Sequence, residues 1–267
     1  MQYRTLDLIE NTRIEGNTIN FIKNIPFVKE AEAVYGEILD LIYPRRCPVC
    51  DDIVVPKGAL ICLECRSRLR YIREPRCRKC GKQLHSMEKE FCYDCGKRKH
   101  LFVRGIALYD YQGIKESIYR FKYKGRAEYA EFFGMDIAEK LGKEILAWKP
   151  DALIPVPLHS SKLRMRTYNQ AELLAEKLGK ELSIPVYGKY VQRTRSTRPQ
   201  KELDDMQRQK NVERAFNISR NDVELKKTVV IDDIYTTGST IDSVAAALLE
   251  SGVEEIYFVT LSIGEGV

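Results

Sequence analysis

The sequence predicts an α/β fold: an open, mostly parallel sheet with helices on both faces, preceded by a small cysteine-rich module. Two apolar segments, 151–156 and 228–231, are each followed by a loop and then by apolar residues at helical spacing. A third apolar segment, 255–261, follows the second of these helices. Strands that alternate with helices favour a parallel sheet, while all eight cysteines precede residue 100 and indicate a separate module.

The chain divides into three predicted parts. Residues 1–44 form an N-terminal extension with no motif, in which 30–43 is expected to be a short helix. Residues 45–99 form the cysteine-rich module and 100–267 the α/β domain, which suits a chain of 267 residues with 44% hydrophobic content. The sequence shows no secretory signal and no apolar run of about 20 residues, so we expect a cytoplasmic protein without membrane insertion.

Every cysteine belongs to a Cys-x-x-Cys pair, and the pairs recur every 15 residues. This spacing offers two sulfurs to one metal, so four pairs predict two structural, tetrahedral Zn²⁺ sites. Sequential pairing and interleaved pairing are both open, whereas disulfides are disfavoured by the expected compartment. Because 45–99 holds few apolar residues, metal binding should supply much of its folding free energy. The predicted ligands are Cys47, Cys50, Cys62, Cys65, Cys77, Cys80, Cys92 and Cys95.

The same module is basic and contains aromatic residues. Segment 45–104 holds 16 Lys or Arg and 7 Asp or Glu, a formal charge of +9. Each Zn²⁺ with four thiolates carries −2, so two sites reduce this to about +5. Basic and aromatic side chains together are typical of single-strand binders, although zinc ribbons also serve as structural or protein-binding elements. The aromatic candidates are Tyr71, Phe91, Tyr93 and Phe102, while His85 and His100 are expected at the surface.

The stretch 228–240 predicts a buried strand that runs into an anion-binding turn. The strand residues are β-branched, and the turn opens a helix whose first amide groups have no partner within the helix. Carboxylates beside this turn can accept hydrogen bonds from ribose hydroxyls and can help to hold Mg²⁺. The alternative is a capped turn with two solvated acids. The candidate residues are Asp232, Asp233, Thr236, Thr237, Gly238, Ser239 and Thr240.

The loop between 156 and 168 is basic and follows another predicted strand, so it can offer donors to an anion such as pyrophosphate. Its candidates are His159, Lys162, Arg164 and Arg166. Segment 121–125, Phe-Lys-Tyr-Lys-Gly, is interpreted as an amphipathic turn before a helix over 127–146.

The acid pair and turn of 228–240 resemble the phosphoribosyl pyrophosphate (PRPP) signature of type I phosphoribosyltransferases. Two further segments indicate a more specific similarity, to the ComF family. This similarity extends over roughly residues 40–262 of the chain. The two segments are 155–159 with Arg164, Arg166 and 169–171, and then Arg193, Thr197, Gln200, Arg208 and 211–216. The resemblance implies that 193–214 closes over PRPP, which would make Arg193 and Arg208 further contacts for pyrophosphate. A solvated surface loop would have much the same composition and is the alternative.

The resemblance implies a PRPP-binding protein that acts in natural competence, with incoming single-stranded DNA and other competence proteins as partners. Purine-salvage relatives carry an acid three residues after the second carboxylate, but this chain has Thr236 there. A purine acceptor is therefore disfavoured. Two alternatives remain open: a phosphoribosyltransferase enzyme with an unidentified acceptor, and a regulator that senses PRPP without catalysis.

Overall fold

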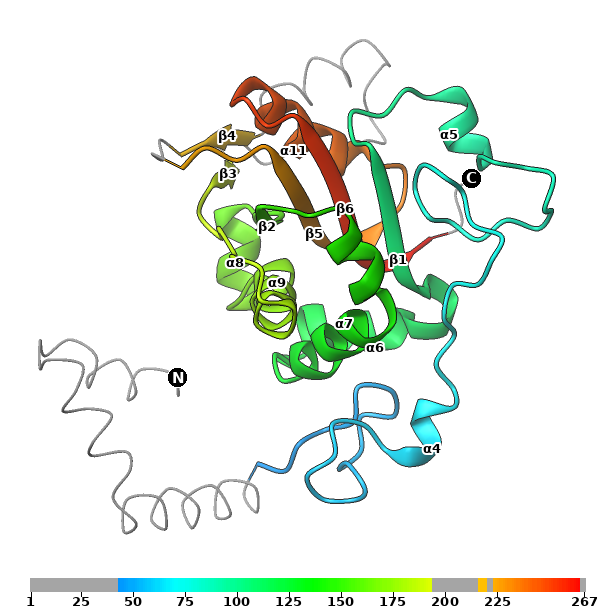
Figure 1. The fold of residues 1–267 in the computed structure, drawn as a ribbon. Helices are drawn as coiled ribbons and strands as arrows, with labels where there is room; N and C mark the ends of the chain where they lie inside the picture. The colour runs from blue at the N-terminus through cyan, green and yellow to red at the C-terminus, as the bar shows by residue number, and fades with distance from the viewer. Residues whose placement is uncertain (1–42, 194–215, 220–222, 265–267) are drawn as a thin grey trace, which may run out of the picture. The chain divides into compact units, whose positions relative to one another are not determined.

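The protein contains a four-stranded parallel sheet in the order β1-β6-β5-β2. A computed structural model describes residues 43–193, 216–219 and 223–264 (Figure 1). The strands are β1 (Arg104–Asp110), β2 (Ala152–Pro155), β5 (Lys227–Tyr235) and β6 (Glu255–Ile263). The register sets Val229 beside Tyr257 and Ile231 beside Val259. The predicted parallel sheet is confirmed.

Helices cover both faces of this sheet (Figure 1). On β5, Val229 and Ile231 belong to the apolar core shared with α7 and α9, whereas Val230 belongs to the core shared with α11. This alternation follows from the two-residue period of a strand, and it explains why the strand is apolar throughout. The helices are α6 (Tyr111–Tyr123), α7 (Tyr129–Ala147), α9 (Gln170–Leu182) and α11 (Ser239–Glu250).

Helix α6 corrects the prediction of a turn at 121–125. Ile114, Ile118 and Phe121 are buried at helical spacing on the face toward the sheet, so 121–123 form the last turn of a helix. The chain turns only at Lys124 and Gly125, where the glycine has φ +68°. As a result Lys122 is held on a packed helix instead of a surface turn.

Smaller elements complete the description. Helix α8 (Ser160–Arg166) follows β2, and the antiparallel pair β3 (Val191–Arg193) and β4 (Phe216–Ile218) packs beside α11. Helices α4 (Leu63–Arg66) and α5 (Tyr93–Lys97) each begin directly after a cysteine. No helix in the described part of the chain is long and apolar enough to span a membrane.

The two cysteine segments pack on the α/β domain, and the described residues from 46 onward belong to one compact unit. In the first segment, Asp51 binds Arg126 at 2.8 Å and accepts a hydrogen bond from the Tyr129 hydroxyl at 2.6 Å. In the second, the Lys79 carbonyl accepts a hydrogen bond from the Gly105 amide of β1 at 2.8 Å. The first segment joins the core that contains α7, whereas the second joins the core that contains α11. The boundaries at 45 and 100 stay predictions.

Candidate functional site

The end of β5 and the start of α11 form the candidate anion site. Strand β5 continues to Tyr235, so both acids lie in the strand itself, near its carboxyl end. The neighbouring strand β2 ends opposite Ile231, one residue before the first acid. Gly238 has φ +82°, a conformation that favours glycine, and it precedes α11 as the N-cap residue. It has no side chain to cap the helix, and the start of a helix favours an anion such as phosphate.

The two acids face opposite sides of the strand edge, as neighbours on a strand do. Asp233 is 8% exposed and forms an ion pair with Lys122 of α6, with 2.8 Å between Oδ2 and Nζ. Burial, followed by the negative charge of Asp233, raises the pKa of Asp232 to about 7. Lys122 and Arg193 act in the opposite direction on that pKa. Asp232 is therefore a carboxylate whose charge the protein tolerates poorly without a further cation.

Four cationic side chains form a group beside the acid pair: Lys122 pairs with Asp233, Arg193 interacts with Asp232, and Lys162 and Arg166 lie near these two cations. Partial burial, and then the positive charges of Arg193, Arg166 and Lys122, lower the pKa of Lys162. Burial also lowers the pKa of Arg193, which Asp232 partly offsets. The cations outnumber the two carboxylates, so this edge of the sheet attracts anions. Lys122 is a member that the sequence reading did not select, because its segment was interpreted as a turn.

The predicted pyrophosphate contacts occupy different surroundings. Lys162 and Arg193 belong to the cation group, and Arg166 is 9% exposed and donates hydrogen bonds to Tyr123 at 2.9 Å and Gln170 at 3.1 Å. Arg166 therefore also anchors α8. The candidates His159 and Arg164 are outside this core: the His159 side chain accepts a hydrogen bond from the Ser161 amide at the start of α8, and Arg164 is exposed. Arg208 lies outside the described residues.

The eight cysteines form two tetrads, in which all four sulfurs lie within 4.8 Å of one another. A zinc ion with Zn–S bonds of about 2.3 Å requires sulfurs about 3.8 Å apart, so both tetrads match its geometry. The Sγ atoms of Cys80 and Cys92 are 3.7 Å apart. The structure therefore selects sequential pairing over interleaved pairing. The tetrads are Cys47, Cys50, Cys62 and Cys65, and Cys77, Cys80, Cys92 and Cys95.

His100 is buried, so the expectation of a surface histidine was wrong for this residue. Its side chain is 1% exposed, and its Nδ1 lies 2.7 Å from Oδ2 of Asp242 in the first turn of α11. The other oxygen of Asp242 accepts a hydrogen bond from the Leu101 amide at 2.9 Å. The position of His100 in the basic module hid this contact, which spans 142 residues of sequence.

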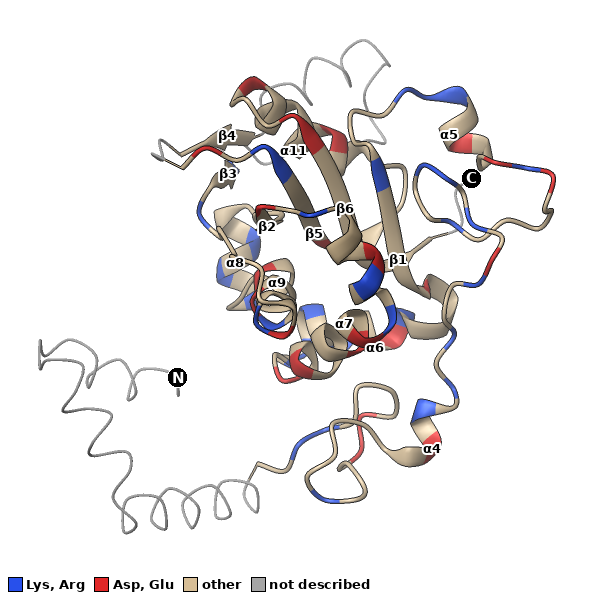
Figure 2. Cartoon of the chain, viewed as in Figure 1, with Lys and Arg blue, Asp and Glu red and all other residues tan. Residues whose placement is uncertain are grey.

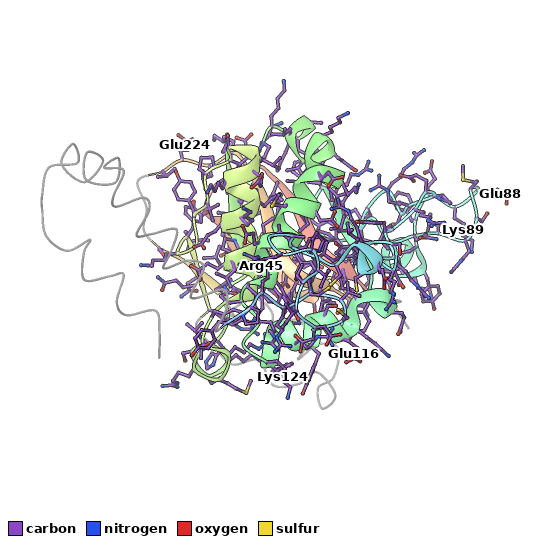
Figure 3. All side chains as sticks on the ribbon, turned by 90° about the horizontal axis from the view of Figure 1, so that it is seen from below. Arg45, Glu88, Lys89, Glu116, Lys124 and Glu224 are labelled. Atoms are coloured by element: carbon purple, nitrogen blue, oxygen red, sulfur yellow. The ribbon has the colours of Figure 1, made fainter. Side chains whose placement is uncertain are left out.

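A groove of about 1330 Å³ runs along the second cysteine segment to the carboxyl ends of β1 and β6. Figure 2 shows blue basic residues on the loops of this segment, and Lys89 lies at the tip of one loop beside Glu88 (Figure 3). Among the predicted stacking residues, Phe91 and Tyr93 are exposed and line the groove, but Phe102 is 1% exposed. Tyr71 also lines it, but its hydroxyl donates to Asp136. The cationic side chains that line the groove are Arg68, Arg70, Arg73, Lys82, Lys89 and Lys97.

The parallel sheet, the acid pair and the glycine turn together define a phosphoribosyltransferase-type domain. Residues 129–263 match the phosphoribosyl transferase domain model, and residues 38–96 match the double zinc ribbon domain model. The N-terminal module is thus a double zinc ribbon, and the ligand chemistry of its tetrads supports structural zinc.

Sequence relatives identify the family. The chain is 30% identical to competence protein ComFC of Bacillus subtilis over 202 residues, which cover 72% of this chain and 79% of that protein. It is 38% identical to competence protein F of Haemophilus influenzae over 109 residues, 40% of this chain and 48% of that protein. It is 34% identical to DNA utilization protein YhgH of Escherichia coli over 107 residues, 40% of this chain and 47% of the relative. The chain belongs to the ComF family. Its matches thus span about half the length of the latter two relatives.

Proposed function

We propose that this protein binds PRPP, or a related ribose phosphate, together with Mg²⁺ at the edge formed by β5 and α11. The observation that carries the proposal is an acid pair that lies next to a helix start without a side-chain cap and beside a group of cations. The amides and hydroxyls of 236–240 would hold the 5′-phosphate. Asp232 and Asp233 would accept hydrogen bonds from the ribose hydroxyls, and Lys162 and Arg193 would face the pyrophosphate.

The raised pKa of Asp232 fits a divalent cation at this site. Hard oxygen ligands suit Mg²⁺, and its charge would neutralise both carboxylates and part of the pyrophosphate. Without the metal, Lys122 supplies one compensating charge to Asp233. We therefore expect Lys122 to exchange partners when ligand arrives, since a phosphate oxygen is an alternative acceptor for its ammonium group.

We further propose that the protein handles single-stranded DNA in natural competence. The names of its relatives favour such a role, and the basic groove along the second ribbon supplies a matching surface. Its lining combines six Lys or Arg with Asp94 and Asp110, and the aromatic rings of Phe91 and Tyr93 are exposed for stacking. Positive charge attracts the phosphate backbone and aromatic rings stack on bases, which together favour single strands.

A second candidate function is phosphoribosyl transfer itself. The cations around Asp232 would stabilise departing pyrophosphate while the acid pair orients the ribose. The acceptor would differ from a purine, since the exposed Thr236 stands where purine-salvage relatives have an acid. A sensor that binds PRPP without turnover uses the same residues, so only a measurement of product separates the two.

The test is ³¹P NMR of zinc-loaded protein with PRPP and Mg²⁺, with and without single-stranded DNA. We expect shifts of the PRPP resonances that are lost in Asp232→Asn; absence of shifts in the parent protein would refute the site. Pyrophosphate release above background would establish an enzyme, and binding without release would favour the DNA-handling or sensing role.

The groove is tested separately by DNA titration. Lys89→Gln and Tyr93→Ala should weaken binding of a labelled single strand, whereas Lys180→Gln, an exposed lysine on α9, serves as the control of equal charge change. Loss of one phosphate contact in Lys89→Gln should also lower the salt dependence. Equal affinities for the three variants and the parent protein would overturn the assignment of the groove.

A further inference from the structure

The second zinc tetrad is built into the core beneath the candidate phosphate turn. Cys77, Cys80 and Cys92 share one buried cluster with Tyr235 and Phe258. The Tyr235 ring stacks on Phe258, with 4.7 Å between centroids. Tyr235 is the last residue of β5 and lies three residues before Gly238. The second tetrad therefore shares a core with the strand residue that precedes the turn.

His100 provides a second connection between the same parts. It follows Cys95 by five residues and pairs with Asp242, whose amide donates to the Gly238 carbonyl at 2.8 Å. A Cβ placed on Gly238 would lie 2.9 Å from Cε1 of His100, so the ring packs directly against the turn. The His100 ring also stacks on Phe102, with 4.8 Å between centroids. The turn at Gly238 thus packs against His100, which directly follows the second ribbon in the chain.

The first tetrad has no such connection among the described contacts. Its segment is fixed to α6 by Arg120, which donates a hydrogen bond to the Val49 carbonyl, and to α7 and the loop before it by Asp51, which contacts Tyr129 and Arg126. Its cysteines belong to the core on the other face of the sheet. The two zinc ribbons have the same cysteine spacing, but they pack against different parts of the α/β domain. One supports helices of the domain, and the other supports the start of α11.

We infer that His100 is a positioning residue of the ribose-phosphate site, which links the second zinc tetrad to the turn at Gly238. This inference rests on the proposed function. Its effect is positional, because thiolates around zinc and the Asp242 carboxylate are negative and would repel a phosphate if they acted by charge alone. Zinc in the second tetrad fixes the segment that carries His100, and His100 fixes Asp242 and the first turn of α11.

Two substitutions of His100 separate its hydrogen bond from its packing. His100→Asn retains a donor near the position of Nδ1 but loses half of the ring, whereas His100→Phe retains a stacking ring but leaves Oδ2 of Asp242 without its partner. Ribose 5-phosphate is the probe, titrated by ³¹P NMR at full zinc content. We expect His100→Phe to weaken binding about tenfold and His100→Asn to retain most of the affinity. The reverse order, or two unchanged affinities, would overturn the inference.

Zinc removal is tested by comparing Cys80→Ser with Cys50→Ser. Each should lose one zinc by elemental analysis, and ribose 5-phosphate affinity should fall more in Cys80→Ser. Equal losses would refute a special link to the second tetrad. Asp51→Asn, which weakens the ion pair of the first ribbon, is the matched control for His100 and should leave affinity unchanged. If the parent protein itself does not bind ribose 5-phosphate or PRPP, the proposed function fails before the inference is reached.

Discussion

Asp232→Asn should stabilise the ligand-free protein while it abolishes binding of Mg²⁺ and ribose phosphate. Burial and the charge of Asp233 raise the pKa of Asp232 from 3.8 to about 7. That difference corresponds to an upper bound of about 4 kcal/mol against the charged form at high pH. The variant also weakens the Asp233 amide's 2.8 Å hydrogen bond to Asp232, so we expect a net gain of about 1–2 kcal/mol.

The sign of this effect depends on pH. The folded-state pKa of Asp232 lies above the unfolded value, so the carboxylate destabilises the fold progressively as pH rises from about 4 to 7. The gain from Asp232→Asn should therefore be larger at pH 8 than at pH 5. A gain of 1–2 kcal/mol corresponds to a rise of roughly 2–8 °C in the unfolding midpoint of a domain this size, which differential scanning calorimetry resolves.

Asp233→Asn is the matched control. It removes the same formal charge from the same strand, but it also removes the 2.8 Å ion pair with Lys122. The Lys122 side chain is only 16% exposed. We expect no gain in stability at pH 8, because an unpaired buried ammonium group offsets the relief of repulsion. A lower midpoint for Asp232→Asn at pH 8, or an equal gain at pH 5 and pH 8, would refute the assignment of a destabilising charge to Asp232.

Three further predictions concern the ligand and zinc sites. Mg²⁺-dependent binding of ribose 5-phosphate should weaken about tenfold between pH 8 and pH 6, because protons compete for Asp232; a flat calorimetric profile would contradict this. Gly238→Ala should lower that affinity at least about tenfold, since φ is +82° and the new Cβ would lie 2.6 Å from the Tyr235 hydroxyl; unchanged NMR titrations would count against the turn. Cys62→Ser should retain one of two zinc ions by elemental analysis, and a full complement would disprove its role as a ligand.

The sequence was informative wherever a local pattern carried the chemistry. The β-branched strand 229–231 and the alternation with helices predicted the parallel sheet, because a strand buried on both faces must be apolar throughout. The Cys-x-x-Cys spacing predicted metal ligands for the same kind of reason, since two residues between thiolates bring both sulfurs to one ion. The roles assigned to Asp232 and Asp233 stay predictions, although the structure places both at the expected edge.

Contacts between distant segments could not be read in this way. Nothing near Lys122 in sequence indicates that its ammonium group lies 2.8 Å from Asp233. His100 resembles a surface residue of a basic module until α11 brings Asp242 to its ring. The choice of sequential over interleaved cysteine pairing likewise required the positions of all eight sulfurs.

The sequence by itself determined the buried strands β2, β5 and β6, the Cys-x-x-Cys knuckles and the glycine turn before α11, because each depends on residues within a few positions of one another. Only the tertiary structure decided which cations lie beside the acid pair and that His100, rather than a residue of the first ribbon, packs against the turn at Gly238. Those features depend on how helices and ribbons pack on the two faces of the sheet, and packing joins residues whose separation along the chain carries no signal.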